Sequence, residues 1–186
     1  MRRRNFLGIH FQNILFFAVR NFSVENQDEK FICRCIELSQ ESVDSGDAAF
    51  GAVIVQDGKI IVEALNDYKT KVTEHAEIVA LNKAHKLLGT SKLSDCTLYS
   101  NCEPCAMCSF MIREFKVKRV VYALPSLYMG GHSRWNILQD EELEKLNPYF
   151  GKPPEVLGGI LQEEAQKVML KTPLWMFGSD AEEREK

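Results

Sequence analysis

The sequence predicts an α/β fold, in which a mixed five-stranded sheet carries helices on both faces and forms the middle of three layers. Two observations predict it. Phe50 to Val55 and Lys59 to Ala64 are strand-like runs, and Asp57-Gly58 between them is a tight-turn signal typical of an antiparallel hairpin. Further downstream, strand-like runs alternate with helical patterns, and strands joined through helices become parallel neighbours.

The expected elements follow in order along the chain. From about 27 to 45, apolar residues recur at helical spacing, and the pattern ends near Gly46. After the hairpin, Thr73 is expected to cap a helix that runs to about Leu88 and closes at Gly89. The remaining elements are a strand at 96–100, a helix at 104–115, a strand at 118–124, a short strand at 155–157 and a helix at 160–170.

The length of 186 residues is enough for one domain with a sizeable core, and we expect that domain at 25–178. Residues 1–24 are interpreted as an N-terminal extension, either disordered or a twin-arginine-like signal, because Arg3-Arg4-Asn5-Phe6-Leu7 pairs arginines before an apolar run. The expected location is cytoplasmic, or periplasmic if that signal is used. The apolar run at 9–19 is too short for a convincing membrane span, and residues 179–186 form an acidic tail.

The charge of the chain argues against a polyanionic partner. The net charge is −3, and without the four arginines of the first 22 residues the chain has 19 basic and 26 acidic side chains, a net charge of about −7. Such a body is a poor electrostatic match to nucleic acid unless it carries a local basic patch. The charge therefore favours a small-molecule partner over a nucleic acid.

Two short stretches carry the residues best suited to chemistry: His75-Ala76-Glu77 and Pro104-Cys105-Ala106-Met107-Cys108. His75, Cys105 and Cys108 offer ligand atoms that zinc prefers, and three ligands leave a fourth position for water. We expect the two helix starts to follow adjacent parallel strands and so to lie at one edge of the sheet. A closed structural zinc site, with Cys102 as the fourth ligand, is the alternative.

Glu77 lies two residues beyond His75. If both residues were helical they would point about 200° apart, so Glu77 is badly placed to share the metal unless His75 lies at an irregular helix start. Glu77 is expected instead beside the bound water, where its carboxylate can move protons. The alternative is an acid that only stabilises the N-terminus of its own helix.

This pattern resembles the zinc-dependent cytidine deaminase superfamily, whose signature is H-x-E with P-C-x-x-C, and in particular its branch of guanine and tRNA adenosine deaminases. The resemblance covers roughly Glu29 to Ala123, with a weaker similarity at 159–165. The stretches that carry it, besides the two motifs, are Phe50-Gly51-Ala52-Val53, Leu98-Tyr99-Ser100-Asn101-Cys102-Glu103 and Arg119-Val120-Val121-Tyr122.

The resemblance implies a cytidine-deaminase-like fold, one Zn²⁺ with a bound water per chain, and hydrolytic deamination of a nucleobase or nucleoside with release of ammonia. It implies that Glu77 is catalytic, that His75, Cys105 and Cys108 hold the metal, and that the chain forms a homodimer. The residues expected to contact substrate are Asn66, the backbone of Ala76, Phe50 and Trp135. Asn66 as a turn residue and Trp135 as a cover for the core are the alternatives.

Three functions stay open at this point. Guanine or a related small base is slightly favoured, because Cys102-Glu103-Pro104-Cys105 resembles the guanine deaminase form of the motif. However, Pro125-Ser126-Leu127-Tyr128 offers no counterpart to an acidic residue that guanine deaminases carry after the fourth strand. The second candidate is a tRNA-specific adenosine deaminase that forms inosine, and the third is a non-catalytic, zinc-stabilised binding module.

Overall fold

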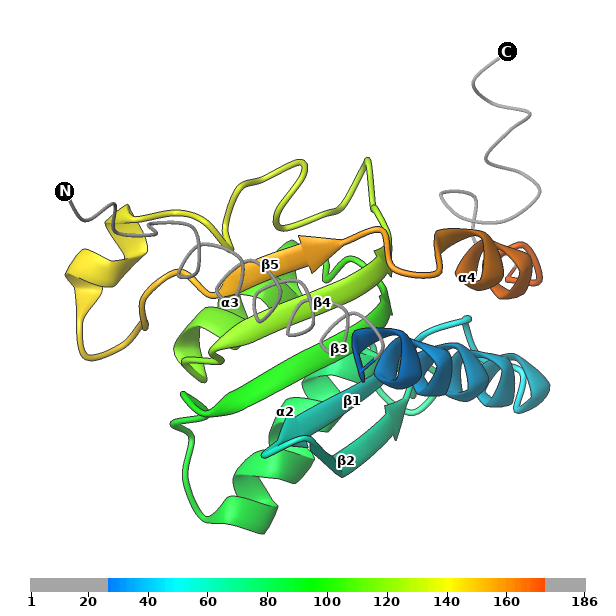
Figure 1. Ribbon diagram of the computed structural model, residues 1–186, viewed down its shortest axis with the longest axis horizontal. Helices are drawn as coiled ribbons and strands as arrows, with labels where there is room; N and C mark the ends of the chain where they lie inside the picture. Colours follow the sequence, from blue (N-terminus) through cyan, green and yellow to red (C-terminus); the bar gives the residue numbers. More distant parts are fainter. Residues whose placement is uncertain (1–26, 173–186) are drawn as a thin grey trace, which may run out of the picture.

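A five-stranded mixed sheet forms the middle layer of the protein, with its strands in the order β2-β1-β3-β4-β5 (Figure 1). The computed structural model describes residues 27–172, so the N-terminal extension and the acidic tail expected from the sequence lie outside the described residues. The strands are β1 Gly51–Gln56, β2 Lys59–Leu65, β3 Cys96–Cys102, β4 Arg119–Leu124 and β5 Glu155–Gly158. The predicted fold class is thereby confirmed.

Strand β1 pairs antiparallel with both β2 and β3, whereas β3, β4 and β5 run parallel to one another. The turn between β1 and β2 is the predicted one: Asp57 and Gly58 have φ angles of 49° and 72°, the left-handed conformation that a two-residue hairpin turn requires. The sequence interpretation was wrong about one neighbour. It placed the two motif-bearing helices after adjacent strands, but β1 lies between β2 and β3.

The position of β1 between β2 and β3 does not place the starts of the two helices at opposite edges of the sheet. Because β2 and β3 are each antiparallel to β1, they point in the same direction. Helix α2 (Ala76–Leu88) follows β2 and helix α3 (Ala106–Glu114) follows β3. Both helices therefore begin at the same edge of the sheet.

Two apolar cores fill the spaces above and below the sheet. On one face, α2 and α3 pack on β1 to β4 through residues such as Ile54, Leu81 and Ile112. On the other face, the helix over 27–44 and α4 (Gln162–Met169) pack on the same strands through residues such as Ile32 and Val121. Figure 1 shows these two helix layers on opposite sides of the sheet.

The helix over 27–44 approaches β1 very closely at Gly51. A Cβ atom there would lie 2.5 Å from the carbonyl oxygen of Cys35 and 2.6 Å from Cβ of Leu38. These distances are shorter than any normal contact, so only glycine lets the helix lie this near the strand.

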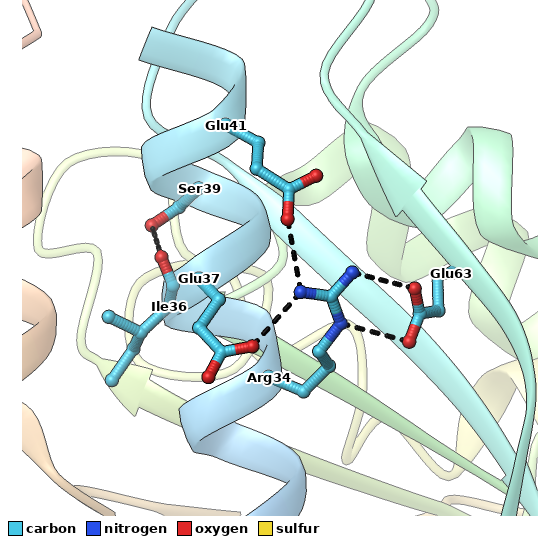
Figure 2. Close-up of polar contacts among 6 residues, drawn as sticks. All are labelled: Arg34, Ile36, Glu37, Ser39, Glu41 and Glu63. Atoms are coloured by element: carbon cyan, nitrogen blue, oxygen red, sulfur yellow. Dashed lines mark hydrogen bonds and ion pairs between the residues drawn. The ribbon is translucent and has the colours of Figure 1, made fainter. Parts of the chain in front are cut away.

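Arg34 links the helix over 27–44 to the edge strand β2 through hydrogen bonds (Figure 2). Its Nε and Nη2 atoms donate to the two carboxylate oxygens of Glu63 at 2.9 and 2.8 Å, in bidentate geometry. Its Nη1 atom donates to Glu37 and Glu41 at 2.9 and 3.0 Å. The group is solvent-exposed, so each pair contributes about 0.5–1 kcal/mol at most.

The segment after β4 is held to α3 by Arg113, whose side chain is almost fully buried. Its guanidinium donates to the carbonyl oxygens of Ile137 and Asp140, each at 2.8 Å, and of Gly151 at 2.9 Å. These bonds order a connection that contains one 3-10 turn, Glu142–Leu146.

Within residues 27–172, no helix combines the length and apolarity that a membrane span needs.

Candidate metal centre and adjoining cavity

Three ligand atoms converge where α2 and α3 begin. Nδ1 of His75 lies 3.6 Å from Sγ of Cys105 and 3.6 Å from Sγ of Cys108, and the two sulfur atoms are 3.6 Å apart. The atoms therefore form an almost equilateral triangle, built from residues 30 and 33 positions apart in the chain.

The triangle has the size that zinc requires. With Zn–S near 2.3 Å, Zn–N near 2.05 Å and tetrahedral angles, the ligand atoms should lie about 3.6–3.8 Å apart. The observed separations of 3.6 Å agree with this. Among the described residues, these three form the group of potential metal ligands whose atoms all lie within 4.8 Å of one another, and Cys102 does not belong to it. The set fits a three-ligand zinc site rather than a closed four-ligand one.

The way the two helices begin explains why His75 and Glu77 face the same site, and why Cys105 and Cys108 do. Helix α2 begins at Ala76 rather than at Thr73, so the expected Thr73 cap was wrong and His75 occupies the N-cap position. His75 is extended, with φ −65° and ψ 152°, and Cys105 is the extended N-cap of α3, with φ −66° and ψ 172°. The 200° separation expected for two helical residues therefore does not apply to His75 and Glu77.

The ligand side chains are electrostatically coupled. The hydrogen bond with Cys108, against the opposing effect of burial, lowers the pKa of Cys105 to about 4. The same hydrogen bond raises the pKa of Cys108 well above its usual value, and hydrogen bonding to Cys105 raises the pKa of His75. The sulfur atoms thus share a proton, and a bound divalent cation would displace that proton and favour two thiolates and a neutral imidazole.

Glu77 lies beside the triangle but outside it. Its Oε2 atom is 3.6 Å from Sγ of Cys108, and its Oε1 atom accepts a hydrogen bond from the Ser100 hydroxyl at 3.2 Å. Only 4% of Glu77 is exposed, and this burial raises the pKa of its carboxyl group. A carboxyl group with a raised pKa next to a metal site is well suited to accept and return a proton near neutral pH.

A cavity of about 310 Å³ opens next to the ligands. The residues that line it come from the loops at this edge of the sheet and from the two helix starts: Ala48, Phe50, Asn66, Tyr68, His75, Glu77, Cys102, Glu103, Cys105, Ser126 and Met129. A space that contains both the metal ligands and the buried carboxyl group is where a reacting molecule would sit.

The structure brings two of the four expected substrate-contact residues to the lining of this cavity. Phe50 and Asn66 line it. Ala76 is fully buried at the first position of α2, between the histidine ligand and Glu77. Trp135 does not lie with the described residues that line the cavity: it is 56% exposed, and the Arg134 guanidinium lies 5.4 Å from its ring centroid. The substrate contacts of all four residues stay predictions.

Glu103 was quoted in the sequence only as part of a motif, and its structural role was missed. It is 3% exposed, and its Oε1 atom accepts from the backbone N–H groups of His132 and Ser133 at 3.0 and 2.7 Å. Its Oε2 atom accepts from the N–H of Ser126 at 2.8 Å and from the Ser133 hydroxyl at 2.7 Å. A Cβ at Gly130 would lie 2.2 Å from Oε1, so the loop closes tightly around the carboxylate.

This loop is also joined to the metal-ligand segment. The N–H of Ala106 donates to the Met129 carbonyl at 3.0 Å, and the N–H of Gly131 donates to the Pro104 carbonyl at 2.9 Å. Ser126 and Met129 line the cavity from the same loop. One buried carboxylate therefore positions the loop wall of the cavity against the start of α3. The sequence offered one signal for it, an acid directly before Pro104, the first residue of the P-C-x-x-C motif.

Comparison with known proteins agrees with the resemblance seen in the sequence. The family model of the cytidine and deoxycytidylate deaminase zinc-binding region matches residues 25–124. A guanine deaminase of Bacillus subtilis is 47% identical over 98 residues, which cover 51% of this chain and 63% of that enzyme. A tRNA-specific adenosine deaminase of Bacillus subtilis is 33% identical over 142 residues, which cover 74% of this chain and 83% of that enzyme.

Solved structures show the same architecture. A structure from a study of tRNA:A34 deaminases superposes with a TM-score of 0.63 over 75% of this chain and 98% of that chain, at 23% identity. At this identity the likeness concerns the fold alone.

Proposed function

Because the chain belongs to the cytidine and deoxycytidylate deaminase zinc-binding family, we propose that it is a zinc-dependent hydrolytic deaminase of a nucleobase or nucleoside, with guanine or a related small base as the favoured substrate. One observation carries the proposal: the triangle of His75, Cys105 and Cys108, with 3.6 Å sides, lies beside the buried carboxyl group of Glu77. The net reaction is water plus an amino-bearing ring carbon giving a ring carbonyl and ammonia.

The proposed mechanism assigns the proton transfers to Glu77. His75, Cys105 and Cys108 would hold a zinc ion, which when bound would supply the Lewis acidity that makes water a nucleophile near neutral pH. Glu77 accepts the proton of that water and delivers it to a ring nitrogen of the substrate. The resulting hydroxide attacks the ring carbon, and Glu77 then takes the proton of the new hydroxyl group and passes it to the amino group. The C–N bond breaks, ammonia leaves and the ring carbonyl forms. The raised pKa of Glu77, caused first by its burial, suits a group that must hold and release protons.

The preference for a free base rests on sequence similarity and charge. The 47% identity to a guanine deaminase lies in the zinc-binding region and exceeds the 33% identity to the tRNA-specific enzyme. The exterior of the 27–44 helix also carries more acidic than basic side chains: Glu29, Glu37, Glu41 and Asp44 against Lys30 and Arg34. Such a surface would repel a polynucleotide backbone.

Editing of adenosine in tRNA is the second candidate, and the length of the match favours it. The likeness to the tRNA-specific adenosine deaminase extends over 142 residues, whereas the likeness to the guanine deaminase covers 98 residues and 63% of that enzyme. A tRNA substrate would require a positive surface along the RNA backbone, and its binding would weaken steeply with salt.

The test is ammonia release by the zinc-loaded full chain over guanine, adenine, cytosine, their nucleosides and nucleotides, and tRNA. The variant Glu77→Gln should lower kcat by at least about 100-fold, because general acid–base catalysis contributes that much or more. It should still bind one zinc ion per chain, because the glutamate is not among the three ligands.

Glu74→Gln is the matched control, since it makes the same chemical change three residues earlier, where the side chain pairs with Lys71. It should keep the wild-type rate. Full activity of Glu77→Gln would disprove the mechanism. Stoichiometric zinc without ammonia release from any member of the panel would instead identify a zinc-stabilised binding module.

A further inference from the structure

A hydrogen-bonded pair at the cavity wall, Asp47 and Asn66, has a polarity that the sequence did not predict. Asn66 lines the cavity and is 6% exposed. Its Nδ2 atom donates to Oδ1 of Asp47 at 2.8 Å. Among the described residues, no group donates a hydrogen bond to its other amide atom, the buried Oδ1.

The identity of the two amide atoms follows from Asp47. An ionised carboxylate can only accept hydrogen bonds, so the NH₂ group of Asn66 must face it and the amide oxygen must face away. Burial tends to raise the pKa of Asp47, but hydrogen bonds from Asn66, Ala48 and Lys69 outweigh it and lower the pKa. Asp47 is therefore charged at neutral pH.

Asp47 is itself held from several directions. Its Oδ1 atom also accepts from the N–H of Ala48 at 2.7 Å, and its Oδ2 atom accepts from the N–H of Lys69 at 3.2 Å. The Lys69 ammonium in turn donates to the Ser45 carbonyl at 2.9 Å. The backbone N–H of Asn66 donates to the Phe50 carbonyl at 3.1 Å. Asp47 therefore cannot turn without breaking several bonds, whereas among the described residues the Asn66 amide is oriented by its bond to Asp47.

We propose that Asp47 is a positioning residue that fixes Asn66 as a hydrogen-bond acceptor, so that the cavity selects molecules presenting an N–H or O–H donor to this wall. The inference rests on the proposed function, because it concerns how that same cavity recognises a purine base or nucleoside. A buried acceptor without a partner is energetically costly, and a donor on the ligand removes that cost. An analogue without the donor leaves the oxygen unpaired and is rejected.

Without Asp47 this selectivity should disappear. The Asn66 amide could then turn by 180° and present its NH₂ group instead, because nothing would fix its orientation. The cavity would accept either a donor or an acceptor at that position. A purely structural role for Asp47 would lower stability without changing which ligand atom is recognised.

The test is calorimetric binding to the zinc-loaded full chain carrying Glu77→Gln, which prevents turnover. The ligands are guanine and its 1-, 7- and 9-methyl derivatives, each lacking one N–H, together with adenosine and its 2′- and 3′-deoxy derivatives, each lacking one O–H. With Asp47 present, one analogue should bind on the order of 10- to 100-fold more weakly than its parent. Adding Asp47→Ala should reduce that ratio to less than about threefold.

Asp44→Ala is the matched control, because it removes one negative charge from an exposed position three residues earlier. It should keep the full discrimination. Zinc content and thermal unfolding show whether each variant is folded. If Asp47→Ala does not fold, Asp47→Asn replaces it, and it should weaken the discrimination because one of its two side-chain atoms can no longer accept.

The outcomes separate this inference from the proposed function. If wild-type protein releases ammonia and the Asp47 variant discriminates as strongly as the Asp44 control, the inference is wrong and the function stands. If the binding pattern appears but wild-type protein deaminates nothing, the function alone is wrong. If no ligand of the panel binds, both are wrong.

Discussion

Replacing Glu103 by glutamine should destabilise the loop that forms one wall of the cavity. Both carboxylate oxygens are used: Oε1 accepts from two backbone N–H groups, and Oε2 accepts from the Ser126 N–H and the Ser133 hydroxyl. In Glu103→Gln the NH₂ group fits better at the Oε2 position, because the Ser133 hydroxyl can rotate to accept from it. The Ser126 N–H then faces a donor and loses its partner.

The magnitude follows from these bonds. One buried N–H left unpaired costs about 1–3 kcal/mol, and the remaining bonds lose the strength that the negative charge gave them. The free energy of unfolding should therefore fall by about 2–4 kcal/mol. For a chain of this length that corresponds to a drop in Tm of roughly 5–15 °C.

Two assays check this prediction at saturating zinc. Thermal unfolding measures the global effect, and hydrogen exchange should show faster exchange at the amides of Ser126, His132 and Ser133. Glu114→Gln makes the same change at an exposed position on α3 and should leave both readouts unchanged. A Glu103→Gln protein within about 0.5 kcal/mol of wild type, with those three amides still protected, would refute the reasoning.

Two further changes test the packing of the 27–44 helix. Arg34 lowers the pKa of Glu63 below its ordinary value of 4.5, so the pair stabilises the fold above pH 4.5 and the contribution is lost as pH falls through the lower folded pKa. Glu63→Gln should cost about 0.5–1 kcal/mol in urea unfolding at pH 7, and a difference from wild type that persists in strong acid would contradict this. Gly51→Ala should destabilise by about 2–3 kcal/mol, because its Cβ would lie 2.5 Å from the Cys35 carbonyl oxygen. An unchanged or raised Tm would show that the helix moves away without cost.

Local signals in the sequence were sufficient for the elements and for the metal ligands. Asp57-Gly58 specified its turn, and Gly89 closes α2 in the left-handed conformation expected of it. The H-x-E and P-C-x-x-C motifs identified the three atoms that the fold brings to 3.6 Å of one another. These features depend on backbone preferences and on ligand chemistry, which residues express within a few positions of one another.

Tertiary structure alone decided how the strands, helices and site residues are arranged relative to one another. The position of β1 between β2 and β3 depends on pairing between distant segments, which local periodicity does not encode. The extended N-cap conformation of His75, which turns it towards the metal site beside Glu77, departs from the simple capping pattern around Thr73. The sequence therefore determined the chemistry of the site. Its geometry, and the roles of Asp47 and Glu103 around it, arise from hydrogen bonds between residues 19 to 30 positions apart, which only the folded chain brings together.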